Sequence, residues 1–272
     1  MHDYIIAVIQ GIVEGITEFL PVSSTGHLIL SGSLLGFTGD KADTFEIIIQ
    51  LGAILAVAVI YWRRILGLLG LVQVETGNGN TGGEQKLNLI HIILACLPAM
   101  VLGLVLHSFI KSYLFSPYTV LAGLVLGGLF MLYGQKRKAV VQAENIDQLT
   151  YKQAIQIGLF QCLSLWPGFS RSGATIAGGL LSGAGYRAAT NFSFLIAIPM
   201  MVAASGYELL KSYQSLTAAD AGVFITGFLV AFVVALLAVI TFLKLLERLK
   251  LAPFAYYRFV LAAGFLIYLL VR

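Results

Sequence analysis

The chain is dominated by apolar runs that are long enough to cross a bilayer. A helix needs about 20 residues to span roughly 30 Å of hydrocarbon. Six stretches meet this length and are predicted to be transmembrane helices: approximately Phe45–Trp62, Leu87–His107, Pro117–Gly134, Thr190–Leu210, Ala221–Leu243 and Pro253–Val271. They leave no room for a soluble domain, so we expect one all-α, polytopic membrane domain over residues 1–272.

Two further apolar regions are shorter, and a Pro-, Ser- and Gly-rich motif interrupts each of them. Tyr4–Leu20 is followed by Leu28–Phe37, and Ala154–Trp166 is followed by Gly173–Leu181. Paired short apolar segments are typical of re-entrant helical hairpins, whose loop backbone must be satisfied by protein or water. We therefore predict two re-entrant hairpins beside the six spans.

Composition agrees with this pattern. Of the 272 residues, 58% are hydrophobic and only 11% are charged, whereas about 25% are charged in a typical soluble chain. The net charge of +4 does not indicate a nucleic-acid partner, because the basic residues fall in short loops between apolar segments. Cys96 and Cys162 lie within apolar segments and are expected to be free packing residues.

The distribution of Lys and Arg predicts the orientation. Three loops carry most of the positive charge and, with six spans, all fall on one side, which should be the cytoplasm. Their basic residues are Arg63, Arg64 and Lys86, then Lys136, Arg137, Lys138 and Lys152, then Lys244, Arg248 and Lys250. The other side has Lys41, Lys111, Lys211 and Arg272. Both termini should then face outward, and Glu75–Lys86 should be a flexible cytoplasmic connection.

The two halves of the chain resemble each other at an offset of 147 residues. The matching pairs are Gly11 with Gly158, Glu14 with Gln161, Ser23 with Ser170, Gly26 with Gly173, and Phe45 with Phe192. Each half would contain one broken hairpin and three spans, and an odd number of crossings forces opposite orientations. We therefore predict an inverted-topology repeat, over about residues 1–135 and 150–272, with the functional site where the broken segments meet.

Glu14 and Glu18 are the costliest residues in the first broken segment, because a carboxylate at the bilayer centre costs roughly 2.5–3.5 kcal/mol. Residues four apart share one helix face. The pair could bind a hard divalent cation such as Mg²⁺ or Ca²⁺. Alternatively, one of them could be a general base, or both could be a structural pair bonded to the backbone of the hairpin.

Hydroxyl groups follow at once in Pro21–His27, where Pro21 and Gly26 are expected to mark a turn. Ser23, Ser24 and Thr25 lie on that turn, and His27 could act as a base, a nucleophile or an acid near neutral pH. His91 and His107 are instead expected to be hydrogen-bonding residues between helices. The cluster around His27 thus predicts nucleophilic or acid–base chemistry.

The matching motif, Pro167–Thr175, contains an arginine among hydroxyl groups. Arg171 is flanked by Ser170 and Ser172, and Thr175 follows. Arginine binds phosphate oxygens in a bidentate manner, and a helix N-terminus next to Gly173 would add an anion site. The same arginine could pair with Glu14 or Glu18 in the resting state.

Together these groups suit phosphoryl transfer to or from a lipid-linked phosphate, which needs charge stabilisation, a nucleophile and a proton donor. The chain lacks a Gly-x-x-x-x-Gly-Lys loop, which argues against ATP-driven pumping. It has no histidine after His107, so the two-histidine relay of acid phosphatase-like lipid phosphatases cannot form.

At these residues the chain resembles the bacterial undecaprenyl-diphosphate phosphatases, also called bacitracin resistance proteins. The similarity rests on Glu14-x-x-x-Glu18, Phe19–His27 and Pro167–Thr175, and includes Thr44-Phe45 and Gln50-Leu-Gly52. It implies hydrolysis of undecaprenyl diphosphate to the monophosphate and phosphate. This reaction recycles the carrier for peptidoglycan synthesis and is linked to bacitracin resistance. The resemblance also implies a divalent cation and a site open to the outer face of the cytoplasmic membrane.

Carried over by position, the resemblance implies a catalytic core of Glu18, Ser24, His27 and Arg171. Glu14, Ser23, Ser170, Ser172 and Thr175 would support it, with Glu14 and Glu18 as the metal ligands. We expect Ser24 to be the nucleophile, with His27 relaying the proton; His27 itself or an activated water is the alternative. The expected partners are a polyprenyl diphosphate and the bilayer, with a homodimer as an option. A transporter or flippase of a polyprenyl phosphate lipid is the alternative function, because inverted repeats are common in transporters.

Overall fold

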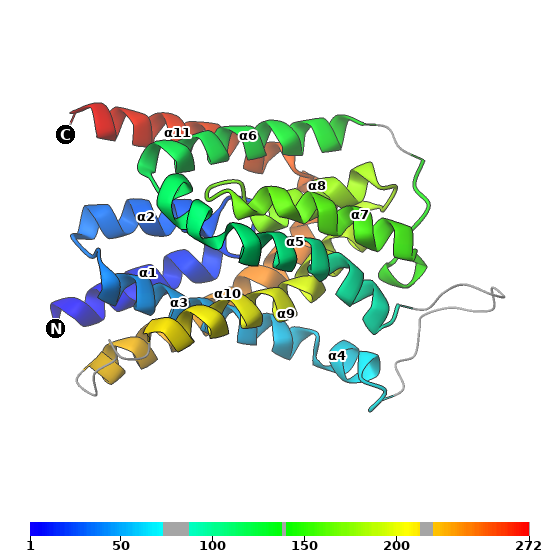
Figure 1. Ribbon diagram of the computed structural model, residues 1–272, viewed down its shortest axis with the longest axis horizontal. Helices are drawn as coiled ribbons and strands as arrows, with labels where there is room; N and C mark the ends of the chain where they lie inside the picture. Colours follow the sequence, from blue (N-terminus) through cyan, green and yellow to red (C-terminus); the bar gives the residue numbers. More distant parts are fainter. Residues whose placement is uncertain (73–86, 138–139, 213–219, 272) are drawn as a thin grey trace.

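The computed structural model describes residues 1–72, 87–137, 140–212 and 220–271, which are built from helices (Figure 1). The first half contains α1 (His2–Thr17), α2 (Ser24–Leu35), α3 (Asp40–Ile60), α4 (Trp62–Leu68), α5 (Leu89–Phe109), the π-helical turn η1 (Ile110–Leu114) and α6 (Pro117–Lys136). The second half contains η2 (Ile146–Gln148), α7 (Tyr151–Gln161), η3 (Cys162–Leu165), α8 (Arg171–Leu181), α9 (Tyr186–Ser212), α10 (Ala221–Leu249) and α11 (Ala252–Val271). The all-α fold class is confirmed.

Six of these helices are long and apolar enough to cross a membrane, and they coincide with the six predicted spans. They are α3, α5 with η1, α6, α9, α10 and α11. Helix α3 begins five residues earlier than predicted, since Gly39 is its N-cap and Asp40 and Asp43 occupy its first turn. Acidic residues are favoured there because the N-terminus of a helix carries partial positive charge.

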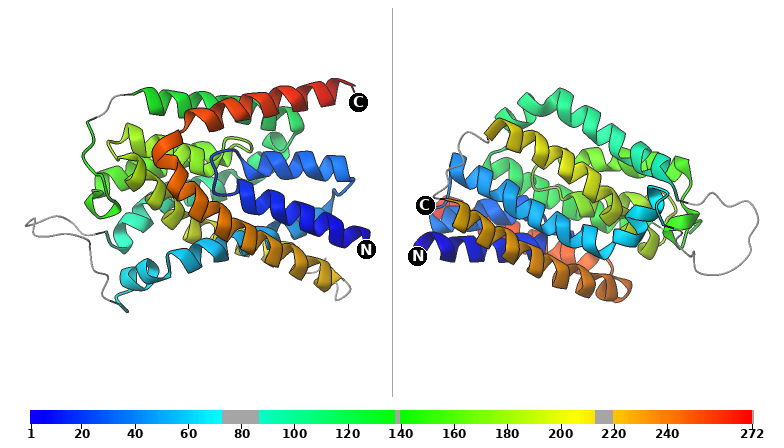
Figure 2. Two further views of the ribbon diagram at one scale, coloured as in Figure 1. Left: turned by 180° about the vertical axis from the view of Figure 1, so that it is seen from behind. Right: turned by 90° about the horizontal axis from the view of Figure 1, so that it is seen from below.

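The two short helical hairpins enter the bundle from opposite ends. In Figure 1 both chain termini and the α2–α3 connection lie at one end, while α4 and the outer ends of α7 and α8 lie at the other. The broken loops of α1–α2 and α7–α8 meet near the middle, and Figure 2 shows the same arrangement from behind and from below. An inverted repeat requires such opposite entry. The repeat itself, and the re-entrant placing of the hairpins in a bilayer, stay predictions.

The two hairpins have the same local geometry where their second helices begin. Ser23 and Ser170 are the N-caps of α2 and α8, and both have a φ of 73°. Their hydroxyl groups accept hydrogen bonds from the backbone N–H of Gly26, at 3.4 Å, and of Gly173, at 3.2 Å. A positive φ is costly for a residue with a side chain. The shared strain therefore marks two equivalent, tightly built turns.

These turns start their helices earlier than the sequence pattern predicts. The hydroxyl motif is predicted to lie on a turn, but α2 begins at Ser24, so Ser24, Thr25 and Gly26 belong to its first helical turn. Likewise α8 begins at Arg171, two residues before Gly173. The reason is the serine cap, which satisfies an N-terminal backbone N–H and so permits helix from the next residue.

Glycine contacts hold the first helix of each hairpin in place. A Cβ on Gly11 of α1 would lie 2.8 Å from the carbonyl oxygen of Gly227 in α10. A Cβ on Gly158 of α7 would lie 2.5 Å from the carbonyl oxygen of Ala95 in α5. Neither approach allows a side chain, so the two hairpins are packed backbone to backbone against long helices. This packing also fixes the positions of the loops that follow α1 and α7.

The two cysteines, and the two histidines of α5, are also expected to have structural roles. Cys96 and Cys162 are free thiols. His107 on α5 bonds Glu208 on α9 at 2.8 Å, as expected of a histidine between helices. His91 differs from that expectation: its Nδ1 accepts from the backbone N–H of Asn88, at the cap of its own helix, at 3.2 Å, its Nε2 has no hydrogen-bond partner among the described residues, and its ring lies tilted against that of Tyr151 in α7. The predicted connection Glu75–Lys86, together with Lys138 and Arg272, lies outside the described residues.

Candidate active site

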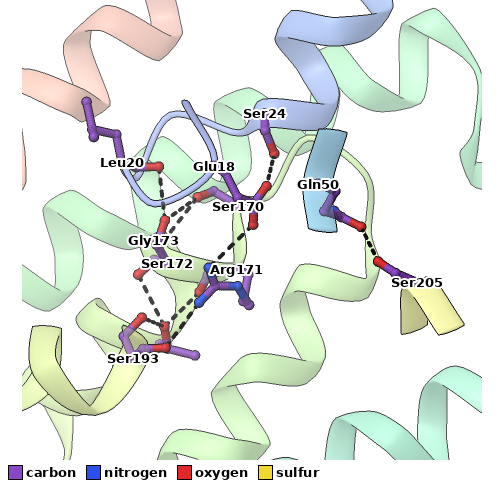
Figure 3. Close-up of polar contacts among 11 residues, drawn as sticks. Glu18, Leu20, Ser24, Gln50, Ser170, Arg171, Ser172, Gly173, Ser193 and Ser205 are labelled. Atoms are coloured by element: carbon purple, nitrogen blue, oxygen red, sulfur yellow. Dashed lines mark hydrogen bonds and ion pairs between the residues drawn. The ribbon is translucent and has the colours of Figure 1, made fainter. Parts of the chain in front are cut away.

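A cavity of about 140 Å³ lies between the two broken loops. Its lining residues come from both hairpins and from two other helices, α3 and α9, and they are Glu18, Ser23, Ser24, Thr25, Gln50, Ser164, Trp166, Pro167, Gly168, Ser170, Arg171 and Met201. The cavity therefore combines the two motifs singled out in the sequence, although they lie some 150 residues apart. Figure 3 shows their polar side chains converging.

Glu18 is the centre of the hydrogen-bond network. It follows the last turn of α1 and is buried. Ser24 Oγ donates to Glu18 Oε2 at 2.5 Å, and Arg171 Nη2 donates to Glu18 Oε1 at 3.4 Å (Figure 3). The carboxylate thus contacts both the predicted nucleophile and the predicted phosphate-binding group. The expected resting pair between Arg171 and one of the two glutamates is present, and its partner is Glu18.

Arg171 is held from several sides at the start of α8. Its Nη1 donates to the carbonyl oxygen of Ser193 in α9 at 3.1 Å. Its guanidinium carbon lies 5.5 Å from the centre of the Phe19 ring, in a cation–π contact. Its buried Nε has no hydrogen-bond partner among the described residues. A fixed guanidinium with a spare donor is suited to an anion.

The other predicted hydroxyl residues divide into two groups. Ser23 and Ser170 cap their helices and line the cavity. Ser172 and Thr175 point into the protein instead: Ser172 Oγ donates to the carbonyl oxygen of Leu20 at 3.0 Å, and Thr175 Oγ1 lies 2.6 Å from Ser193 Oγ. Ser172 therefore joins the second hairpin directly to the loop of the first.

The N-terminal ends of α2 and α8 both border the cavity, through Ser24 and Arg171. Helix N-termini carry unsatisfied backbone N–H groups and partial positive charge, which favour phosphate. Two such ends, entering from opposite directions, add an anion-binding field to that of Arg171.

His27 takes a different direction from Ser24. Its Nδ1 donates to the carbonyl oxygen of Ser23 at 2.7 Å, and its Nε2 accepts from the hydroxyl of Tyr257 in α11 at 2.7 Å. The His27 and Tyr257 rings are stacked with centroids 5.6 Å apart. The histidine does not line the cavity, so the structure brings Ser24 to Glu18 and not to His27. A relay from Ser24 to His27 stays a prediction.

Glu14 lies one helical turn before Glu18 and is only 1% exposed. Neither of its carboxylate oxygens has a hydrogen-bond partner among the described residues. A buried carboxylate without partners is costly, so it needs a proton or a cation. The described residues contain no group of three or more His, Cys, Asp and Glu that could hold a metal ion. Any ion would therefore depend on Glu14, Glu18, water and substrate oxygens.

Two polar residues next to the motifs are not singled out by the sequence pattern. Arg258 of α11 is fully buried and donates through Nη2 to the carbonyl oxygens of Gly168, at 2.6 Å, and Gly123, at 3.1 Å. Gln50 of α3 lines the cavity together with the motifs. Arg258 could have been found from the sequence, because it is a charged residue within an apolar segment. Gln50 stands out in the sequence only as part of a resembling stretch.

The arrangement can carry out phosphoryl transfer. Ser24 Oγ is bonded to a carboxylate that can accept its proton. Arg171 and the two helix ends can stabilise negative charge on a phosphoryl group in the cavity.

Comparison with known proteins gives a consistent result over nearly the whole chain. The model of the family described as bacitracin resistance protein BacA matches residues 7–264. Similar curated proteins include Undecaprenyl-diphosphatase 1 from Bacillus anthracis, from Bacillus thuringiensis (strain Al Hakam) and from Bacillus cereus. Each is 53% identical over 270 residues, covering 99% of this chain and 100% of the relative. The matched length includes both cavity motifs.

Proposed function

The chain belongs to the BacA family of bacitracin resistance proteins, and we propose that it hydrolyses undecaprenyl diphosphate to undecaprenyl phosphate and inorganic phosphate. The relatives named undecaprenyl-diphosphatase match over their full length. The observation that carries the proposal is the cavity in which Glu18 bonds both Ser24 and Arg171. The names of the relatives favour hydrolysis over the transporter or flippase alternative.

The reaction is proposed to begin with Ser24 Oγ attacking the terminal phosphorus of the diphosphate. Glu18 accepts the hydroxyl proton as the Oγ–P bond forms, and the bond from that phosphorus to the bridging oxygen breaks. Undecaprenyl phosphate leaves with the bonding electrons. Glu18 passes this proton to the departing phosphate and is ionised again. Water then attacks the phosphoserine as Glu18 accepts one of its protons, the Oγ–P bond breaks, the proton returns from Glu18 to Ser24 Oγ, and inorganic phosphate is released. The support is the 2.5 Å contact between Ser24 Oγ and Glu18 Oε2.

Arg171 is proposed to bind the transferred phosphoryl group. Its guanidinium already lies against Glu18, Phe19 and the carbonyl oxygen of Ser193. It can therefore stabilise developing charge without being reorganised during the reaction. Ser23 and Ser170 complete the polar lining through their helix-capping hydroxyls, while Ser172 and Thr175 hold the second hairpin in place.

The residues fit a divalent cation beside this site. Glu14 presents two buried oxygens without protein partners among the described residues, and Mg²⁺ usually binds one or two carboxylates together with substrate phosphates and water. Glu14 and Glu18 would hold the ion, which would neutralise charge on the phosphate oxygens. Equilibrium binding of Mn²⁺, followed by electron paramagnetic resonance, tests this: Glu14→Ala should abolish it, and wild-type binding by that variant would contradict the ligand assignment.

The protein is a multi-pass membrane protein, and we propose that it lies in the bacterial cytoplasmic membrane. The concentration of positive charge at the α4 end of the bundle, opposite the termini, supports an orientation in which the termini face outward, and we propose that the site opens to that side. There it would recycle the lipid carrier of peptidoglycan and thereby protect against bacitracin. A homodimer is a further prediction, and light scattering of the purified protein tests it.

A phosphate-release assay tests the proposed function. Purified protein in detergent with Mg²⁺ and a prenyl diphosphate should release one phosphate per substrate. Ser24→Ala should lose at least about a hundredfold in rate. Thr226→Ala, which removes a hydroxyl outside the cavity that is bonded to the carbonyl oxygen of Gly222 within α10, should retain the wild-type rate. Absence of phosphate release by folded wild-type protein would refute the function, and wild-type release by Ser24→Ala would refute the nucleophile.

A further inference from the structure

The cavity has a polar wall that belongs to neither motif. Gln50 lies on α3, and the residue that fixes it, Ser205, lies on α9. Figure 3 shows the Gln50–Ser205 pair to the right of the group formed by Glu18, Ser170 and Arg171, with no polar contact joining the two, and Gln50 lines the same cavity as that group. The phosphate-binding groups described so far therefore account for only part of the cavity lining.

The orientation of the Gln50 amide is set by a buried hydroxyl. Ser205 is 2% exposed, and its Oγ donates to Gln50 Oε1 at 2.9 Å. In the structure the amide oxygen faces Ser205, which leaves Nε2, with its two N–H groups, as the free end. Gln50 Nε2 has no hydrogen-bond partner among the described residues. An oriented donor without a partner at a cavity wall is suited to an acceptor on a ligand.

The proposed substrate offers two groups of acceptors. The terminal phosphoryl group must lie at Ser24 and Arg171 for transfer to occur. The second phosphoryl group, which carries the prenyl chain, then needs a partner elsewhere in the cavity. Because the product retains that second group alone, a monophosphate cannot contact both walls at once.

We propose that Gln50, oriented by Ser205, binds the phosphoryl group attached to the prenyl chain and so selects diphosphates over monophosphates. The inference rests on the proposed function and assigns a role to a residue outside both motifs. A neutral amide suits this role in a transmembrane helix, since a charged group would cost more there. It also binds the departing monophosphate less strongly than a second arginine would.

Inhibition by inorganic pyrophosphate and inorganic phosphate tests the proposal directly. Both anions should compete with a prenyl diphosphate for the wild-type enzyme, and pyrophosphate alone can reach both walls. Gln50→Leu should weaken pyrophosphate inhibition about 10- to 100-fold, the range expected for a hydrogen bond to a charged group. The inhibition constant of phosphate should stay within about twofold, because phosphate is bound at the Arg171 wall.

Two further variants separate binding from packing. Gln50→Glu keeps the shape but presents negative charge, so it should weaken pyrophosphate at least as much as Gln50→Leu. Ser205→Ala keeps the amide but removes the hydroxyl that holds it, so it should weaken pyrophosphate inhibition by less than Gln50→Leu does. Ser205→Thr keeps a hydroxyl, so it should retain the wild-type pyrophosphate inhibition. The ratio of the two inhibition constants is the readout that a purely structural role would not change.

The results that would refute the role of Gln50 differ from the result that would refute the phosphatase function. Equal weakening of pyrophosphate and phosphate in Gln50→Leu, or no change in either, would overturn the role of Gln50 while leaving phosphatase activity established by the wild type. Failure of the wild type to release phosphate would instead refute the function itself.

Discussion

Replacing Glu18 by glutamine should slow catalysis and tighten phosphate binding at the same time. Glu18 has two roles in the structure: it accepts from Ser24 Oγ and it pairs with Arg171 at 3.4 Å. Glutamine keeps the size of the side chain but removes its charge. The nucleophile then loses its base, and the arginine loses the anion that competes with phosphate for its guanidinium.

The magnitudes follow from the contact geometry. Two unit charges 3.4 Å apart interact by about 5 kcal/mol at an effective dielectric constant of about 20. Phosphate regains only part of this, because glutamine can still accept one hydrogen bond from the guanidinium. A recovery of about 1.4 kcal/mol would tighten phosphate binding roughly tenfold. Loss of the base should lower kcat about 10²- to 10⁴-fold.

Phosphate affinity can be measured without turnover from the rise in melting temperature as phosphate is added, with a chelator present so that no cation held by Glu18 contributes. Glu18→Gln should reach a given rise at about one tenth of the wild-type phosphate concentration. Ser24→Ala is the matched control, because it removes the nucleophile but leaves the Glu18–Arg171 pair. It should lose turnover with a nearly unchanged phosphate response. Equal or weaker phosphate binding by Glu18→Gln would show that Glu18 does not compete for Arg171.

Three other substitutions test the elements that position the site. Arg258→Met leaves the loop carbonyls of the second motif without their buried donor, so we expect about 1–3 kcal/mol lower unfolding free energy, measured by thermal unfolding; an unchanged melting temperature would refute the anchoring role. Gly158→Ala forces a Cβ to within 2.5 Å of an α5 carbonyl and should cost about 1–3 kcal/mol, whereas Gly206→Ala, which meets nothing within 4 Å, should be neutral; equal melting temperatures would contradict the packing argument. Tyr257→Phe removes the hydroxyl bonded to His27 outside the cavity, so kcat should stay within about threefold, and a hundredfold loss would place this pair in the proton relay.

The helices can be predicted from the sequence because run length alone decides whether a segment spans a bilayer. All six long helices follow from this criterion. The starts of α2 and α8 are predicted too late. Capping by Ser23 and Ser170 depends on a positive φ at these serines, and amino-acid composition does not indicate such a conformation. Local geometry, not hydrophobicity, determines where these two helices begin.

The site is predictable in its chemistry but not in its connections. Intramembrane charge and hydroxyl clusters point to Glu18, Ser24 and Arg171, which the structure joins by hydrogen bonds. Residues three apart in α2, such as Ser24 and His27, are expected to cooperate. The packing of α11 instead presents the Tyr257 hydroxyl to the imidazole. Which neighbour a side chain meets depends on tertiary packing, and sequence spacing does not contain that information.

If the two halves form the predicted inverted repeat, the difference between them would explain how the cavity between them can act in one direction. The equivalent capping serines give both hairpins the same turn, yet the charges differ: the carboxylates belong to the first half and Arg171 to the second. At the position matching Glu14, Gln161 donates to the carbonyl oxygen of Ala95 at 3.3 Å and so contributes to packing, whereas Glu14 has no hydrogen-bond partner among the described residues. An in-line displacement needs a nucleophile on one side of phosphorus and a leaving group on the other. In the proposed mechanism, sequence divergence at matched positions would supply that polarity, with Glu18 and Ser24 on the attacking side.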